Sequence, residues 1–275
     1  MTQADPQIDT TSVVAIVSGG LDSTTLVYDL VSQGRKVDLV GFNYGQRHKR
    51  ELSYMVATAR TLGLRYDVVD LRSMTYLLSS ARSSLVNDDV AVPEGHYAQD
   101  NMKATVVPNR NMIMLSIAGG IAVARGADQI ATAVHGGDHF IYPDCRPNFI
   151  AYANAAILVG NAGFGGIPED VDQRMPGTAF PEFIHTPYLN RTKADIAHRA
   201  LELNVPLHMT WSCYKGGSNH CGRCGTCVER LEAIDEALRR TNTNDLPYYN
   251  EDLTTYDDTE FWKVAIAKAK EAKNV

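Results

Sequence analysis

Residues 12–30 read SVVAIVSGGLDSTTLVYDL. The apolar run Val13 to Val17, rich in β-branched residues, indicates a buried strand, and the later apolar residues recur at helical spacing. A Ser-Gly-Gly turn at 18–20 joins the two elements. A glycine-rich turn between a strand and a helix presents unpaired backbone N–H groups at the positive end of the helix dipole. This junction therefore predicts a phosphate-binding loop in an α/β fold.

Strands and helices alternate around this junction. Apolar runs predict strands over 37–42, 65–71 and 128–134, with helices over about 48–62 and 112–126 between them. Such alternation predicts a doubly wound parallel sheet. Residues 72–105 are irregular and predict an insertion or a lid. Later helices are expected at 149–159, 192–203 (with Asn190 or Thr192 as the cap), 228–238 and 261–269.

The length, composition and net charge of the chain narrow the class of protein. The chain has 275 residues, 44% of them hydrophobic, and a formal net charge of -6. No apolar stretch is long enough to span a membrane, and the polar start, MTQADPQIDTTS, does not resemble a signal peptide. We therefore expect a cytoplasmic protein. The acidic balance argues against direct nucleic-acid binding, and Arg47-His48-Lys49-Arg50 is the best local basic patch.

Four of the five cysteines lie close together: Cys213, Cys221, Cys224 and Cys227. Their C-x2-C steps are the spacing of tetrahedral zinc sites, and a closed four-thiolate site is structural. His220 is a spare candidate ligand. A redox pair, disulfides and an iron–sulfur cluster are the alternatives. Zn²⁺ is the favoured occupant.

The glycine turn matches one known kind of phosphate loop. A Walker A motif is excluded because no Gly-Lys pair occurs in the chain, and the Rossmann G-x-G-x-x-G is absent at this turn. Ser18-Gly19-Gly20-Leu21-Asp22-Ser23-Thr24 instead resembles the pyrophosphate loop of the N-type ATP pyrophosphatases (PP-loop enzymes). The resemblance implies the adenine-nucleotide α-hydrolase type of fold and ATP binding by Val17, Ser18, Gly19, Gly20, Leu21, Asp22, Ser23, Thr24 and Thr25. Because Asp22 would repel phosphate, we expect it to hold Mg²⁺ or to brace the loop.

The loop and the cysteine cluster together narrow the family further. The stretches 42–48 (FNYGQRH), 107–111 (VPNRN), 142–146 (YPDCR), 185–194 and 212–214 (SCY) also contribute. The chain resembles the 7-cyano-7-deazaguanine synthase family over roughly residues 13–240. We accordingly divide it into a polar tail (1–12), a PP-loop ATP-binding α/β domain (13–205), a small zinc-bound helical region (206–240) and an acidic extension (241–275).

The resemblance implies a reaction. The family converts 7-carboxy-7-deazaguanine and ammonia to the nitrile, adenylating first the carboxylate and then the amide. Cationic side chains would stabilise the charge that builds up at the α-phosphate. The expected catalytic residues are Asp22, Arg110, Arg146 and Lys193, and the expected substrate-binding residues are Arg47, His48, Asp138 and Asp144. Cys145 is interpreted as a small buried hydrophobic residue. A homodimer is also implied.

Two departures keep alternatives open. Asn109 replaces the usual glycine of V-P-G-R-N, although Asn tolerates positive φ. Residues 134–141 depart from the family's more usual acidic pattern, and this segment lies at the predicted ligand edge of the sheet. A variant that stops at 7-amido-7-deazaguanine, for DNA modification, is the first alternative. A PP-loop tRNA-modifying enzyme and a non-enzymatic zinc module that binds nucleic acid are more distant ones.

Overall fold

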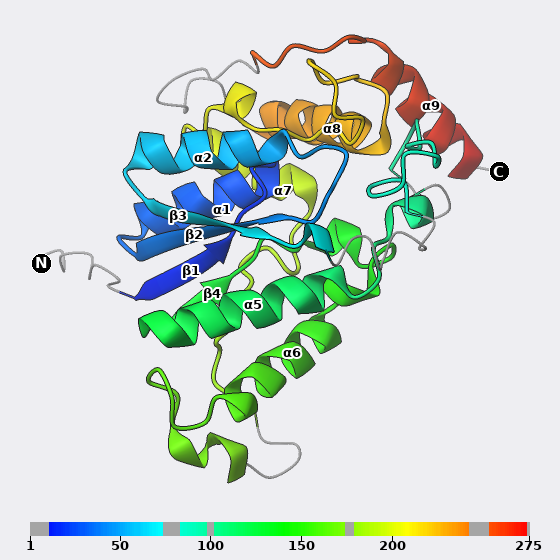
Figure 1. Cartoon of the computed structure of the whole chain (residues 1–275). Coiled ribbons are helices and arrows are strands. Elements are labelled where there is room, and N and C mark those ends of the chain that lie inside the picture. The colour runs from blue at the N-terminus through cyan, green and yellow to red at the C-terminus, as the bar shows by residue number, and fades with distance from the viewer. Residues whose placement is uncertain (1–10, 74–82, 98–101, 174–178, 242–252, 274–275) are drawn as a thin grey trace, which may run out of the picture.

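A five-stranded parallel sheet organises the protein (Figure 1). The computed structural model describes residues 11–73, 83–97, 102–173, 179–241 and 253–273. The strand order is β3-β2-β1-β4-β5. The chain first adds β2 and β3 on one side of β1, and then β4 and β5 on its other side. The strands are β1 (Ser12–Ile16), β2 (Lys36–Asn43), β3 (Arg65–Asp70), β4 (Gln129–Ala131) and β5 (Ile184–His185). The predicted parallel α/β sheet is confirmed.

Helices cover both faces of the sheet (Figure 1). Because successive strand residues point to opposite faces, Val13 and Ala15 pack toward α1 and α2, whereas Val14 packs toward α5 and α6. This alternation makes two hydrophobic layers, one on each side of the sheet. The α-helices whose bounds lie within the described residues are α1 (Leu21–Ser32), α2 (Glu51–Leu62), α5 (Arg110–Arg125), α6 (Pro147–Gly160), α7 (Lys193–Glu202), α8 (Gly225–Arg240) and α9 (Phe261–Lys273).

Several predicted boundaries shift. α2 begins at Glu51 rather than at residue 48, because residues 47–50 form turns. β4 keeps only three of the seven residues predicted for it, since its partner β5 is two residues long and was not predicted. Of the two candidate caps for α7, Thr192 is confirmed: it forms a capping box with Asp195.

The C-terminal extension packs against the cysteine region. The backbone N–H of His220 donates to Thr255 O at 3.1 Å, and that of Asp257 donates to His220 O at 2.8 Å. α8 packs on α7, and α7 on α1, through a shared apolar cluster that includes Leu21, Leu201 and Ile234. The expected zinc-binding region is therefore continuous with the core of the α/β domain. Residues 1–10 of the expected polar tail and residues 242–252 and 274–275 of the extension lie outside the described residues.

Within the predicted insertion (72–105), residues 83–97 are irregular apart from one bridge, and Lys103–Thr105 form a short 3-10 helix. Glu94 forms an isolated antiparallel bridge with Cys224, and Gly95 N–H donates to Arg223 O at 2.9 Å. Pro93 O accepts from Gly225 N–H at 3.2 Å. This segment therefore braces the start of α8. Across the described ranges, every helix is too short or too polar to cross a bilayer.

Candidate active site

A cavity opens where β1 and β4 end, which is the position at which ligands bind in sheets of this order. The glycine loop forms one wall and residues 132–134, after β4, form another. Aromatic and apolar side chains line it as well, among them Phe42, Tyr44, Met114 and Tyr214. The cavity thus joins a loop suited to phosphate with a surface suited to a flat ring.

The loop has the backbone geometry expected for an anion site. Gly19 has φ +95°, and a Cβ there would lie 2.1 Å from the carbonyl oxygen of Glu51, so only glycine fits. The N–H groups of Ser18 and Gly19 donate to Ser23 Oγ, each at 3.3 Å. Gly20, the N-cap residue of α1, has no side chain with which to cap the helix. The first-turn N–H groups therefore face the cavity edge as donors for a phosphate.

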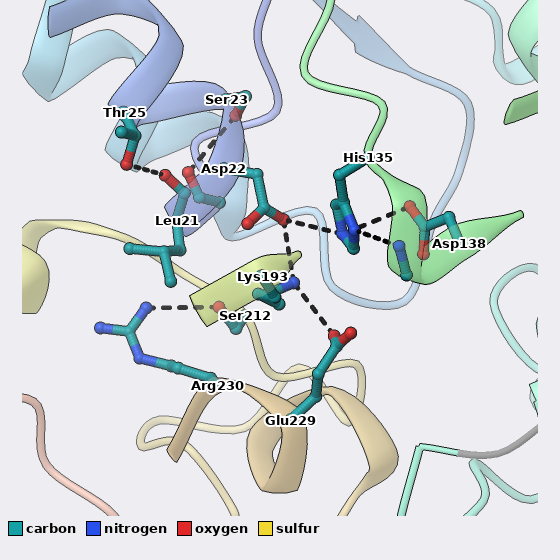
Figure 2. A network of polar contacts seen from close by, with 12 residues as sticks. Leu21, Asp22, Ser23, Thr25, His135, Asp138, Lys193, Ser212, Glu229 and Arg230 are labelled. Atoms are coloured by element: carbon teal, nitrogen blue, oxygen red, sulfur yellow. Dashed lines mark hydrogen bonds and ion pairs between the residues drawn. The ribbon is translucent and has the colours of Figure 1, made fainter. Parts of the chain in front are cut away.

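A chain of charged side chains crosses the floor of the site (Figure 2). Lys193 Nζ lies 2.9 Å from Asp22 Oδ2 and 3.1 Å from Glu229 Oε2. Burial alone would raise the pKa of Asp22, but Lys193 and then His135 lower it, so the carboxyl group is ionised. The pKa of Lys193 is raised above its usual value: burial opposes this, but Asp22 and Glu229 outweigh it. Glu229 was not predicted from the sequence, because nothing in its local pattern shows that α8 faces Lys193.

A second group of polar side chains extends from Asp22 toward residue 138. His135 Nε2 lies 3.5 Å from Asp138 Oδ2 and 3.9 Å from Asp22 Oδ2. His135 Nδ1 accepts the N–H of Gly137 at 3.1 Å, so a neutral ring carries its proton on Nε2, between the two carboxylates. Tyr97 donates its hydroxyl hydrogen to Asp138 Oδ1 at 2.9 Å. The expected residue Asp138 therefore lines the cavity in a fixed orientation.

Glu51 is a buried carboxyl group that the sequence analysis missed. It lines the cavity, accepts from Gln46 Nε2 at 3.2 Å and has Oε1 3.6 Å from His48 Nε2. Burial raises the pKa of Glu51 to about 8. Burial, aided by Arg110 and Arg47, lowers the pKa of His48 to about 3. The cavity thus contains a neutral imidazole beside a carboxyl group that titrates near neutrality.

Arg110 lies at the start of α5 with its guanidinium 5.9 Å from the ring of Tyr142. Burial opposes its charge, but Tyr44, Tyr214, Tyr142 and Asp144 together raise its pKa above the usual value. Asp144 accepts from Asn111 N–H at 3.1 Å and so anchors the same helix end. Asn109, which replaces the family's usual glycine, has φ +57°, in the positive range that Asn tolerates. Arg110 lines the cavity. Asp144 does not line it, but it holds the helix end that carries Arg110.

Besides Asp144 and Gly19, four expected residues do not line the cavity. Thr24 and Thr25 are fully buried, and Thr25 Oγ1 donates to Leu21 O at 2.8 Å. Arg47 is held by Asp88 at 3.1 Å and by the carbonyls of Asn87 and Val90. Arg146 is exposed and donates to His139 O at 2.7 Å. Their roles in catalysis or binding stay predictions, and the contacts seen here brace the surrounding loops.

The four clustered cysteines converge on one point. Their Sγ atoms all lie within 4.8 Å of one another, and the pair Cys221–Cys227 is 3.9 Å apart. Four thiolates around one tetrahedral zinc ion are about 3.8 Å apart. Backbone N–H groups of Arg223 and Cys224 donate to Cys221 Sγ at 3.4 and 3.2 Å. All four are free thiols, so the site fits a single metal ion.

His220 has a different role from the cysteines. Its Nε2 accepts the N–H of Ser212 at 3.0 Å, and its ring packs 4.3 Å from that of Trp211. The ring therefore connects the cysteine region to the segment beside the glycine loop. It is not part of the metal-binding group.

Comparison with known proteins identifies the family. A family model described as "Queuosine biosynthesis protein QueC" matches residues 12–238. The chain belongs to the QueC family. It is 45% identical to 7-cyano-7-deazaguanine synthase 1 of Mesorhizobium japonicum over 93% of this chain and 97% of that protein. It is 44% identical to the synthase of Paracoccus denitrificans, over 94% and 99%. The predicted family is confirmed, and the chain is an enzyme rather than a non-enzymatic zinc module.

Solved structures are more distant. The U34-tRNA thiolase NcsA from Methanococcus maripaludis, with its [4Fe-4S] cluster, has a TM-score of 0.42 at 12% identity, covering 97% of this chain and 68% of that one. A structure described as a predicted subunit of tRNA methyltransferase from Methanocaldococcus jannaschii has the same TM-score at 17% identity, covering 70% and 75%. Similarity at this level does not bear on the function of this QueC-family member.

Proposed function

We propose that this enzyme converts 7-carboxy-7-deazaguanine and ammonia to 7-cyano-7-deazaguanine with two molecules of ATP. The observation that carries the proposal is the uncapped N-terminus of α1 beside the Asp22–Lys193 pair, in one cavity with the aromatic wall. The first-turn N–H groups would bind the β- and γ-phosphates, which leave as pyrophosphate. Curated relatives similar over nearly their whole length carry the same synthase name.

In the first round a substrate carboxylate oxygen attacks the α-phosphorus and pyrophosphate leaves. Ammonia then attacks the acyl carbon, and AMP leaves with the oxygen, giving the amide. Lys193 and Arg110 are the cations that would neutralise charge building up at the α-phosphate. In the second round the amide oxygen attacks the α-phosphorus of a second ATP and pyrophosphate leaves. Loss of two protons from nitrogen and departure of AMP then give the nitrile.

Two metals fit the residues present. Asp22 Oδ1 is buried and has no hydrogen-bond partner among the described residues, so Asp22 would hold Mg²⁺, which when bound neutralises phosphate charge. The four cysteines would hold Zn²⁺, because the 3.9 Å sulfur–sulfur distance suits one tetrahedral ion. A closed four-thiolate site has no open position, so its zinc would be structural.

The remaining binding residues have separate tasks in this proposal. Asp138, held by Tyr97, would accept N–H groups of the substrate. His48 is neutral and lines the cavity beside Glu51. Arg47, Arg146 and Asp144 would position the loops and the helix end that carry these groups. A cytoplasmic location, a homodimer and the lack of direct nucleic-acid binding remain predictions.

Mass spectrometry of the product tests the proposal. The enzyme is incubated with 7-carboxy-7-deazaguanine, ATP, Mg²⁺ and ammonium. A nitrile product, with two AMP formed per nitrile, is the expected result. Amide that accumulates without nitrile would assign the reaction to the variant that stops after one round. Failure to form either product would contradict the proposal.

A further inference from the structure

Arg230 is a fully buried arginine on α8 whose side chain reaches Ser212 (Figure 2). A guanidinium group has five N–H donors. Among the described residues, five hydrogen bonds hold this one: Nε to Tyr256 Oη at 2.9 Å, Nη1 to Thr210 Oγ1 at 2.6 Å and Ser212 Oγ at 3.3 Å, and Nη2 to Leu207 O at 2.7 Å and Thr254 Oγ1 at 3.0 Å.

Three of these acceptors lie in the segment 207–212, which borders the nucleotide site. The N–H of Trp211 in this segment donates to Gly19 O at 2.8 Å. Ser212 and Trp211 line the cavity together with Asp22, whose pKa is lowered in part by the charge of Arg230. The position of the glycine loop therefore depends on where the segment 207–212 is held.

The other two acceptors, Thr254 and Tyr256, belong to the C-terminal segment 253–260. This segment is joined to the cysteine region by the two backbone hydrogen bonds of His220 and by Arg223, which lies 3.1 Å from Asp258. The match to the family model ends at residue 238, so that match does not cover the segment 253–260. Arg230 thus forms hydrogen bonds with both the nucleotide side and the C-terminal side.

Burying a guanidinium costs solvation free energy, and a well-packed apolar side chain would often stabilise the fold equally well. The guanidinium contributes geometric specificity instead, because its planar fork of N–H donors sets the angle and distance at which each acceptor binds. We propose that Arg230 is a positioning residue for nucleotide binding, which fixes the segment 207–212 against the glycine loop, and that the C-terminal segment 253–260 holds it in place. The proposal rests on the proposed use of ATP at this loop.

The test compares Arg230→Met and Arg230→Lys with Arg239→Met, an exposed arginine on the same helix that pairs with Asp235. The readouts are the ATP KM, kcat, the Kd for α,β-methylene-ATP and the metal content of the purified protein. We expect Arg230→Met to raise KM and Kd about tenfold or more, with kcat at saturation within about threefold and metal retained. Arg230→Lys keeps some donors and should recover part of the affinity. Arg239→Met should match the wild type.

Hydrogen exchange separates this role from the reaction itself. Without nucleotide, the N–H of Trp211 should exchange about tenfold faster in Arg230→Met than in the wild type. A variant that melts earlier but keeps its ATP KM and its Trp211 protection would overturn the proposal. If the wild type binds no nucleotide, the proposed function fails, while the exchange rate still tests the positioning role.

A second variant guards against misfolding of Arg230→Met. The double change Thr254→Val with Tyr256→Phe keeps the guanidinium and removes two acceptors in the C-terminal segment. We expect an ATP KM about threefold higher and faster exchange at Trp211. Unchanged values would show that the C-terminal segment does not hold Arg230 and would overturn that half of the proposal.

Discussion

The glycine loop and the cysteine cluster are both short, but they are held in different ways. The loop takes its shape from its own backbone: Gly19 has positive φ, and Ser23 Oγ accepts from two loop N–H groups. The cysteine region depends on partners far away in sequence, including Glu94 and Asp258, and on four thiols that crowd together. Nearby residues specify the backbone conformation of the loop, whereas the arrangement of the cysteine region depends on tertiary packing.

Lys193 joins the two regions, so its removal should have the largest effect. Lys193→Met deletes a cation from the expected α-phosphate site and leaves Asp22 and Glu229 buried without it. We expect kcat/KM for ATP to fall by about a hundredfold or more. Steady-state kinetics measures this, with Lys36→Met, an exposed residue at the start of β2, as the control. A loss of less than about threefold would remove Lys193 from the catalytic residues.

The second-largest effect should come from removing one of the four clustered thiols. Cys224→Ser replaces one of four ligands, and we expect bound metal to fall below about a tenth of the wild-type content, with earlier thermal unfolding. Elemental analysis and a melting curve measure these. Cys145→Ser is the matched control, since Cys145 is buried but lies outside the cluster. Full metal content in Cys224→Ser would contradict the four-thiolate site.

Alanine substitutions at two glycines test whether the close backbone approach at Gly19 shapes the loop. Gly19→Ala places a Cβ 2.1 Å from Glu51 O, whereas Gly63→Ala, also at positive φ (+66°), meets nothing within 4 Å. Gly63→Ala should cost about 1 kcal/mol of unfolding free energy from backbone strain alone, and Gly19→Ala about 3 kcal/mol or more, with loss of ATP binding. Denaturant unfolding compares them. Equal costs would mean that the close approach does not shape the loop.

Glu51 gives a pH dependence of known sign. Its pKa is raised to about 8 in the folded state from 4.5, so the folded protein binds more protons between these values. The contribution of the protonated group to stability is present below about pH 4.5 and is lost as the pH rises toward 8. We expect the stability of the wild type relative to Glu51→Gln to fall by about 2 to 4 kcal/mol over this range.

The comparison with Glu51→Gln is needed because His48 acts in the opposite direction. Its pKa is lowered to about 3, so the folded state binds fewer protons than the unfolded state between there and 6.5, and stability rises with pH. Subtracting the two unfolding curves removes most of this contribution. A difference that does not change between pH 5 and 8 would show that Glu51 is ionised throughout.

The sequence by itself determined the parallel sheet, the glycine loop, the cysteine cluster and the family. Each is encoded in residues close together in the chain: β-branched runs with helical periodicity after them, or a motif within about fifteen residues. The same holds for Thr192 as a helix cap and for Asn109 at positive φ, where local backbone chemistry decides.

Only the tertiary structure decided which side chains meet. Glu229 and Arg230 are adjacent on α8, yet one reaches Lys193 and the other reaches both Thr210 and Tyr256. Glu51 gained its raised pKa from burial, which no local pattern reports. Thr24 and Thr25 match the loop motif but are buried away from the cavity. Pairings between distant segments, and the burial that sets a pKa, depend on how the helices pack, which a single sequence does not encode locally.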